Sequence, residues 1–432
     1  MNKNTFIVGF MLFAMFFGAG NLIFPPKLGF ESHSEYLLAA LGFIVTGVGL
    51  PFVGVLISSF YAGGYTAALK KIHPWFSVLF LSAIYLSVGP FVAIPRTAAT
   101  SYELALLPYL SNASDSSLYI FSAVYFIVAL WLALNPSKMV ERVGAVLTPV
   151  LLLTLAALVI KGAMILTGEH LPVEPSLTEH VFSTGLVSGY LTMDALASIA
   201  FSVIVIAAIQ SKGVSDKDLP RQTLYAGLIA ASALAVIYMS LSWLGSKMPL
   251  SADTLLMLKE KNLDLGTYIL NSLSLQAFGE LGHIVLGIIV TLACLTTAIG
   301  LIVSVSEYFY TLYHKISYKI YALFFTALSF LIANQGLNTV LSKSIPVLLA
   351  LYPIAITVIV LMGINLLIKV PLIAQRVSIL LVSLISLSSV FGLSFTEQLP
   401  LKSIAMEWIP FAGIGVVIGY LLSFFMPNSE TE

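Results

Sequence analysis

The sequence has few charged residues. Asp, Glu, Lys and Arg make up 9% of its 432 positions, whereas hydrophobic residues make up 59%. A soluble domain carries roughly a quarter charged residues because its surface faces water. This composition therefore excludes a soluble protein and predicts an all-helical integral membrane protein, in which helices satisfy their own backbone hydrogen bonds within lipid.

Cysteine and catalytic motifs are also scarce. Cys294 is the single cysteine, which excludes a disulfide framework and a cysteine-based zinc site. The histidines fall in expected loops or near span ends, and neither H-E-x-x-H nor G-x-S-x-G occurs. Lys and Arg form no basic stripe, and the formal net charge is zero. We therefore expect no enzymatic activity, no cofactor and no nucleic-acid partner.

Apolar runs recur from the first residues of the chain to the last. A helix needs about 20 mostly apolar residues to cross a bilayer, and the runs between polar, Pro and Gly interruptions predict about twelve spans. They are expected near residues 5–24, 36–60, 75–107, 118–134, 140–166, 182–210, 222–245, 281–311, 318–333, 345–367, 377–393 and 404–426. The first is interpreted as a retained span rather than a processed signal peptide. The longest connector, residues 246–280, is expected to form at most a short surface helix.

The distribution of basic residues predicts the orientation. Lys and Arg near spans are retained on the cytoplasmic side of the membrane. If the N-terminus is inside, the inner segments hold more basic residues than the outer ones, among them Lys70, Lys71, Lys212, Lys217 and Arg221. Both termini are then expected to be cytoplasmic.

Two of the expected spans contain residues that interrupt a helix. The first contains Gly18-Ala19-Gly20-Asn21, and each Gly weakens a helix by roughly 1 kcal/mol. The sixth contains Gly185, Gly189 and, in an otherwise uncharged stretch, Asp194. Irregular backbone at membrane depth is tolerated only where it is buried in protein or lines a cavity.

Matching breaks in two five-span halves indicate an inverted repeat with a substrate site near the midplane. The expected division is residues 1–170 for the first repeat, 171–370 for the second, and 371–432 for two additional spans. The alternative is that these glycines only allow helices to pack closely.

Four charged residues are expected to lie inside the bilayer, away from the span ends and loops: Arg96, Glu103, Asp194 and Glu307. Each costs roughly 2.5–3.5 kcal/mol to insert, so each is expected to face protein or water. Arg96 and Glu103 lie seven residues apart on one helix face and are expected to form an ion pair. Glu307 is expected to reach the membrane interface. Asp194, beside a break, is a candidate partner for a substrate ammonium or a cation, with a structural role as the alternative.

The eighth span contains two adjacent hydroxyls, those of Thr296 and Thr297, after a small residue. Hydroxyl and carbonyl oxygens are the ligands of a hard cation such as sodium, and unwound backbone can supply further carbonyls. The alternative is that each Thr bonds a carbonyl of its own helix.

Three segments carry a resemblance to a known family: GFMLFAMFFGAGNLIFPP at residues 9–26, GYLTMDALASIAF at 189–201 and LACLTTAIG at 292–300. Together they resemble the bacterial branched-chain amino acid transport system II carriers, and the similarity extends over essentially the whole chain. The resemblance implies a carrier in the bacterial cytoplasmic membrane that imports leucine, isoleucine and valine with a cation. That family is distantly similar to sodium-coupled amino acid transporters with the leucine-transporter fold of five plus five inverted repeats.

The resemblance also implies ligand residues. In the leucine-transporter pattern, sodium would be held by carbonyls of Ala14, Phe17 and Ala293 and by the hydroxyls of Thr296 and Thr297. The substrate carboxylate would meet backbone amides of the first break, its ammonium would meet carbonyls or the carboxylate of the sixth span, and its side chain would meet an apolar pocket. The implied substrate residues are Phe17, Gly18, Ala19, Gly20, Asn21, Gly189, Tyr190, Thr192, Met193 and Asp194. Asp194 has no counterpart in the leucine-transporter pattern, so its role stays open.

Several alternatives remain at this point. Protons are the alternative coupling ion, and another small neutral amino acid or related organic solute is the alternative substrate. A channel is disfavoured because the sequence has no repeated selectivity-filter loop.

Overall fold

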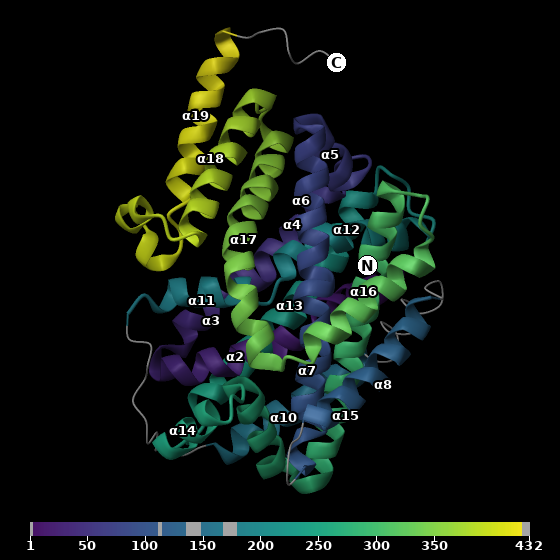
Figure 1. The fold of residues 1–432 in the computed structure, drawn as a ribbon, viewed down its shortest axis with the longest axis vertical. Helices are drawn as coiled ribbons and strands as arrows, with labels where there is room; N and C mark the ends of the chain where they lie inside the picture. Colours follow the sequence, from purple (N-terminus) through teal and green to yellow (C-terminus); the bar gives the residue numbers. More distant parts are fainter. Residues whose placement is uncertain (1–2, 111–114, 135–147, 167–178, 426–432) are drawn as a thin grey trace.

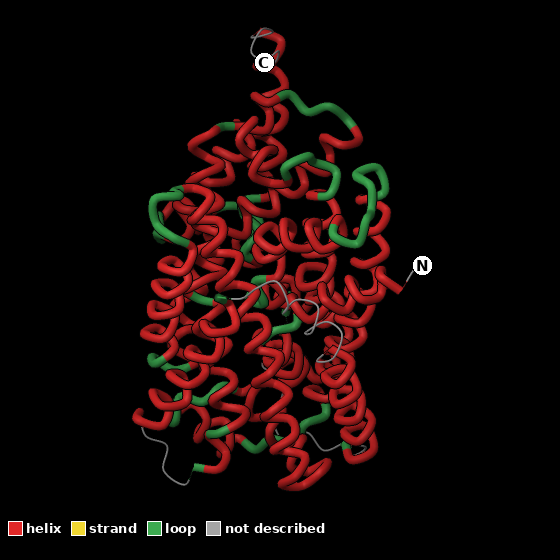
Figure 2. Tube along the Cα trace, turned by 90° about the vertical axis from the view of Figure 1, so that its right-hand side faces the viewer, coloured by secondary structure: helices red, strands yellow, loops and turns green. Residues whose placement is uncertain are grey.

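The computed structural model describes residues 3–110, 115–134, 148–166 and 179–425, and within them it consists of helices and loops without a strand (Figure 2). Eight helical segments of this part are long and apolar enough to cross a membrane. Four shorter apolar helices accompany them: Thr5–Phe16, Pro149–Ile165, Tyr318–Ala333 and Ile409–Phe425. The expected all-helical membrane architecture is therefore confirmed.

The first half of the chain forms a series of helices that begins near the middle of the molecule (Figure 1). They are α1 (Lys3–Phe16), α2 (Ala19–Ser32), α3 (Tyr36–Ile44), α4 (Leu50–Ser58), α5 (Gly64–Ile72), α6 (Pro74–Leu86), α7 (Ala93–Ala105), α8 (Asp115–Ala133) and α10 (Thr148–Ile165).

The second half contains the longer helices. They are α11 (Val181–Tyr190), α12 (Asp194–Gln210), α13 (Leu219–Ser246), α14 (Ala252–Glu260), α15 (Leu265–Leu312), α16 (Tyr318–Ala333), α17 (Leu337–Leu367), α18 (Leu372–Val390) and α19 (Ile409–Phe425). The last two pack against each other at the end of the molecule opposite α14 (Figure 1).

Two expected spans are interrupted by single π-helical turns. Val45–Gly49 joins α3 to α4, and Ser87–Phe91 joins α6 to α7. In the second turn Pro90 has no backbone N–H to donate, and Gly89 leaves the helical conformation at φ −87° and ψ −121°. The sequence patterns did not predict this kink, which separates α6 from α7.

The connector between α13 and the expected eighth span is more helical than predicted. α14 occupies part of it, and α15 already begins at Leu265 rather than near residue 281. A change of direction at Gly279, where φ is 63°, separates the first segment of α15 from the apolar segment that follows. Residues 246–280 therefore form two helices, and the expectation of at most one was wrong. Of the expected span 140–166, residues 140–147 lie outside the described part.

Glycines bring α2 into backbone contact with α13. A Cβ at Gly29 would overlap the carbonyl oxygen of Ser242, and a Cβ at Gly245 would overlap that of Pro26. Small residues allow this approach, as is common between membrane helices. The contact holds α2 deep in the bundle, between α13 and α15, and so positions its N-terminus at the candidate site.

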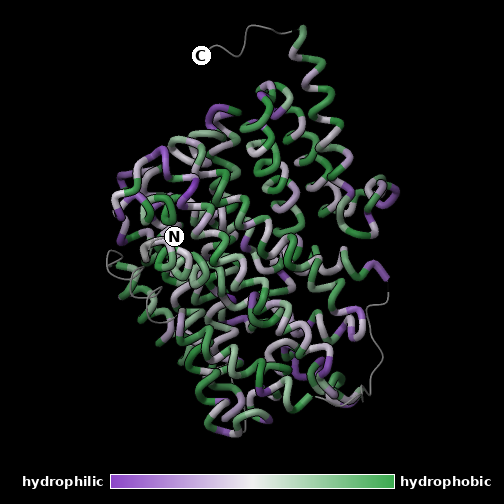
Figure 3. Tube along the Cα trace, turned by 180° about the vertical axis from the view of Figure 1, so that it is seen from behind, coloured by the Kyte–Doolittle hydropathy of each residue, from purple (hydrophilic) through white to green (hydrophobic). Residues whose placement is uncertain are grey.

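Hydrophobic residues extend along most of the helical length, whereas hydrophilic residues gather in the connecting segments (Figure 3). Many large apolar side chains are exposed, including Leu153, Leu281, Leu331 and Phe425. Such a surface suits lipid, because exposed apolar patches of this extent are rare on soluble proteins.

Candidate functional site

Two interruptions of helices, called the first and second breaks, lie at the centre of the molecule. The first separates Phe16 at the end of α1 from Ala19 at the start of α2, and the second separates Tyr190 at the end of α11 from Asp194 at the start of α12. Both pairs of flanking helices contact each other, α1 with α12 and α2 with α11. The predicted interruptions of the first and sixth spans are therefore present, and they face each other.

Asn21 connects the two breaks. Its side-chain oxygen accepts a hydrogen bond of 3.0 Å from the backbone N–H of Gly18, which satisfies a donor freed by the first break. Its side-chain nitrogen donates to a carboxylate oxygen of Asp194 at 2.5 Å and to the hydroxyl of Tyr238. Asp194 is 3% exposed and is the first residue of α12, where the positive end of the helix dipole favours a carboxylate.

Arg96 of α7 satisfies the second break. Its guanidinium donates through Nη1 to the carbonyl of Leu191 at 2.6 Å and through Nη2 to the carbonyl of Thr192 at 2.9 Å. These carbonyls follow the C-terminus of α11, where a cation is favoured. The guanidinium also lies over the ring of Phe24, 5.6 Å from its centroid.

The expected ion pair between Arg96 and Glu103 was wrong. Glu103 lies two helical turns away and accepts a hydrogen bond of 2.8 Å from the hydroxyl of Thr267. Positions seven residues apart share a face of an ideal helix, but about 10 Å of helix rise separates them. Glu307 is exposed near the C-terminal end of α15, and its interfacial position stays a prediction.

A cavity of about 20 Å³ lies between the two breaks. That volume holds about one water molecule. Its lining includes, from the expected substrate residues, Gly18, Ala19, Asn21, Thr192, Met193 and Asp194. Arg96, Thr97 and Thr297 add polar atoms to the lining, and Phe16, Val88, Phe201 and Leu301 are among its apolar residues.

Some of the expected substrate residues lie elsewhere. A Cβ at Gly189 would overlap the hydroxyl of Thr46, so this glycine allows α11 to pack closely, as the alternative reading held. Tyr190 stacks on Tyr352 at 4.7 Å between ring centroids. Gly20 lies against Arg96, because a Cβ there would be 2.8 Å from Nη2.

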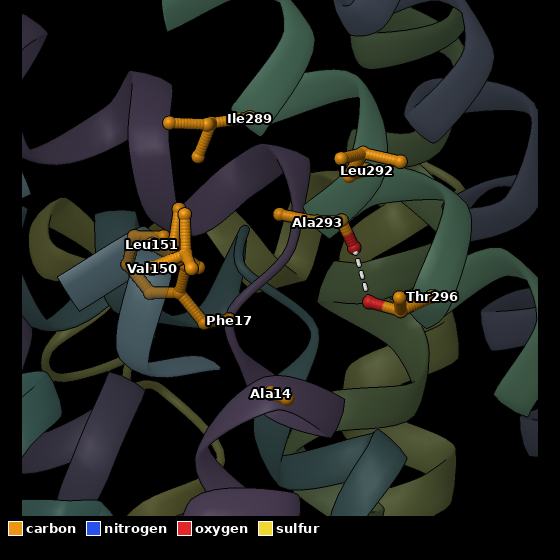
Figure 4. A pocket seen from close by; sticks show the side chains of 8 residues that line it. All are labelled: Ala14, Phe17, Val150, Leu151, Ile289, Leu292, Ala293 and Thr296. Atoms are coloured by element: carbon orange, nitrogen blue, oxygen red, sulfur yellow. Dashed lines mark hydrogen bonds between the residues drawn. The ribbon is translucent and has the colours of Figure 1, made fainter. Parts of the chain in front are cut away.

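Four of the five expected cation ligands, Ala14, Phe17, Ala293 and Thr296, line a second small cavity, also about 20 Å³ in volume (Figure 4). Thr297 lines the central cavity instead. Its hydroxyl is 3.3 Å from the position that a Cβ on Gly18 would take. Unwound backbone of the first break and the hydroxyl pair of α15 are thus neighbours.

Both threonines also have partners within their own helix. The hydroxyls of Thr296 and Thr297 donate to the carbonyl of Ala293 at 2.7 and 3.3 Å. Each hydroxyl still has lone pairs for a cation. The geometry is therefore compatible with both readings of the threonine pair.

A wider cleft of about 740 Å³ lies beside the C-terminal end of α7 and the first segment of α15. Its lining is largely polar and includes Glu103, Asp264, Asn271 and His283. Asp264, in the loop before α15, accepts a bond of 2.9 Å from the N–H of Thr267, and burial raises its pKa. The cleft is wide enough for a small organic solute, whereas the central cavity is not.

Sequence reasoning missed Arg96 and Tyr238 as members of the site. Arg96 carried a usable signal, since an arginine within a span is by default a candidate for function. Tyr238 had no such signal in the sequence, because tyrosines are common in apolar helices.

Comparison with known proteins gave four matches that bear on this chain. A family model described as "Branched-chain amino acid transport protein" matches residues 1–426. A Staphylococcus epidermidis protein described as "Putative branched-chain amino acid carrier protein" is 48% identical over 441 residues, covering 100% of this chain and 99% of its own. A protein of the same description from Staphylococcus aureus strain USA300 is 48% identical over 443 residues, with the same coverage. The solved structure of MhsT in complex with L-phenylalanine matches with a TM-score of 0.58 and 18% identity over 98% of both chains, which shows a shared fold.

The separate partners of Arg96 and Glu103 predict that their contributions to stability are independent. We expect the loss of stability in Arg96→Gln plus Glu103→Gln to equal the sum of the single losses within about 0.5 kcal/mol. Thermal unfolding of the purified proteins in detergent measures this. A double variant that is more stable than either single variant would contradict this independence and would support an ion pair between Arg96 and Glu103.

Proposed function

This chain belongs to the branched-chain amino acid transport protein family, and from that premise we propose that it imports leucine, isoleucine and valine by symport with a cation. The meeting of two helix breaks at one buried cavity carries the proposal, because irregular backbone at membrane depth is characteristic of transporter sites. Sodium is the proposed coupling ion. No chemical change of the substrate is involved.

The proposed architecture is twelve spans in a leucine-transporter-like arrangement. Residues 1–170 would form the first repeat of five spans, residues 171–370 the inverted second repeat, and residues 371–432 the two additional spans. The position of the breaks supports this division, because each lies in the first span of its repeat. The protein is proposed to reside in the bacterial cytoplasmic membrane with both termini in the cytoplasm.

The proposed substrate site is the central cavity. The ammonium group of the substrate would lie near Asp194, and its aliphatic side chain would contact apolar residues such as Met193 and Phe201. A cavity of about 20 Å³ is too small for leucine. Binding therefore requires the helices around the two breaks to move apart, as alternating access by rocking of helix groups provides.

In the proposed orientation the wider cleft opens to the outside, because α7 ends and α15 begins on the outer face. The cleft borders Glu103, two helical turns beyond Arg96 on α7. It is a suitable entry path, since its polar lining accommodates a zwitterion before the zwitterion reaches the buried cavity.

The proposed sodium site joins the carbonyls of Ala14, Phe17 and Ala293 to the hydroxyls of Thr296 and Thr297. Its support is that the first three and Thr296 line one small cavity (Figure 4), and that the hydroxyl of Thr297 lies close to Gly18 of the first break. An ion that contacts both α1 and α15 would hold these helices together, so its binding would favour the conformation that also binds the substrate.

Counterflow in proteoliposomes tests the proposed function. Vesicles that contain the purified protein and unlabelled leucine are expected to accumulate labelled leucine, isoleucine and valine. Accumulation of labelled alanine, which has a smaller side chain, is measured for comparison. Sodium and pH gradients imposed separately then identify the ion, and we expect the sodium gradient to drive uptake. A flux without exchange would indicate a channel, and accumulation of alanine alone would contradict the proposed substrates.

Thr297→Ala tests the sodium site. Loss of one oxygen ligand worth about 1 kcal/mol should raise the half-saturating sodium concentration for leucine uptake roughly fivefold. Thr291→Ala is the matched control, because Thr291 lies on the same helix and its hydroxyl likewise donates within α15, to Gly287 at 2.7 Å. Equal sodium dependence in both variants would contradict the site.

A further inference from the structure

Arg96 has donor capacity that the protein does not use. Two of its nitrogens bond to carbonyls of the second break, but its Nε is buried and has no hydrogen-bond partner among the described residues. A guanidinium carries five N–H groups in a planar fork, and each Nη carries a second N–H beside the one already used. Unpaired donors on a buried cation are unfavourable, so the site lacks an acceptor.

The guanidinium is held in a fixed position. The carbonyls of Leu191 and Thr192 hold one edge at 2.6 and 2.9 Å, and the ring of Phe24 lies against its face. Gly20 leaves room for it, since a Cβ there would be 2.8 Å from Nη2. A receptor group fixed before the ligand arrives loses little conformational freedom on binding.

A second, opposite charge borders the same cavity. Asp194 is held by Asn21 at 2.5 Å, and both Asp194 and Arg96 line the cavity between the breaks. Within the described part of the chain these two side chains form no ion pair within 4.0 Å, so each can still offer polar atoms to a ligand. A buried cation and a buried anion facing one cavity match the two charges of an amino acid zwitterion.

We propose that Arg96 binds the carboxylate of the transported amino acid, side-on through Nε and one Nη, while Asp194 binds its ammonium. This inference rests on the proposed function. It departs in one respect from the arrangement that the family resemblance implied, because the backbone amides of the first break are no longer the main carboxylate ligands. Side-on binding uses the donors left free, and its two parallel N–H···O bonds add both energy and geometric specificity. It also makes a free carboxylate a requirement for transport.

A different role for Arg96 predicts the opposite result. The guanidinium occupies carbonyls that a substrate ammonium could otherwise use, so it could act as a tethered competitor. Removing a competitor strengthens leucine binding, whereas removing a carboxylate ligand weakens it. The sign of the change therefore separates the two roles.

The test compares ligands that differ in one charged group. Binding of leucine and of leucinamide, which lacks the carboxylate, is measured on the purified protein with sodium present, at about pH 6.5 so that both amines are protonated. The wild type is expected to prefer leucine at least about 100-fold, because a site built to bond a polar group rejects analogues that lack it. Similar affinities for both ligands would overturn the proposal without any variant.

Variants then assign the preference to Arg96. In Arg96→Gln we expect weaker leucine binding and a leucine-to-leucinamide preference close to one, whereas Arg96→Lys should retain an intermediate preference because it keeps the charge but not the fork. Arg376→Gln is the matched control, since Arg376 also donates to a backbone carbonyl, that of Ile72 at 2.6 Å, but lies on α18 away from the cavity.

The outcomes are distinct. Tighter leucine binding in Arg96→Gln, or an unchanged preference in Arg96→Gln or Arg96→Lys, would overturn the role of Arg96 and leave the proposed function intact. If Arg96→Gln does not fold, the leucine-to-leucinamide preferences of the wild type and of Arg96→Lys decide whether Arg96 binds the carboxylate. A wild type that binds none of leucine, isoleucine and valine would contradict the proposed function and this inference with it.

Discussion

The structure depends on how backbone groups are satisfied where two helices break inside the membrane. Lipid offers no hydrogen bonds, and each unsatisfied group costs several kcal/mol. Asn21 serves the first break by accepting from Gly18, and Arg96 serves the second by donating to Leu191 and Thr192. The surrounding architecture places these two side chains: α2 is held against α13 by glycine contacts, and Arg96 is a buried residue of α7, which follows the kink at Gly89.

In the proposed site, the same groups would allow a ligand both to bind and to leave. Hydrogen bonds to Asn21 and Arg96 hold the breaks in the absence of substrate, and a zwitterion can replace part of them without leaving charges unpaired. The central cavity is closed to all but about one water molecule. Transport through the proposed site would therefore require movement of the broken helices, whose irregular segments can act as hinges because they lack continuous helical hydrogen bonds.

Sequence reasoning located the breaks but not the partners that satisfy them. Two glycines beside Asn21, and a lone carboxylate in an apolar run, are local signals, so the interruptions near Gly18 and Asp194 were predictable. The partner of Arg96 was not, because Leu191 lies 95 positions away and helix spacing suggested Glu103 instead. Similarly, a glycine that breaks a helix and one that allows close packing look alike in sequence, which is why Gly189 was assigned to the site.

The most direct test of the central claim, that substrate binds between the two breaks, is protection of an engineered cysteine at Ala19 from alkylation in a Cys294→Ala background. Ala19 is 2% exposed and lines the central cavity, whereas a cysteine at Ser272, in the wide cleft, serves as the control. We predict that leucine with sodium slows alkylation at position 19 at least about tenfold and changes the rate at position 272 little. Unchanged alkylation at position 19, in protein that still binds leucine, would contradict the site.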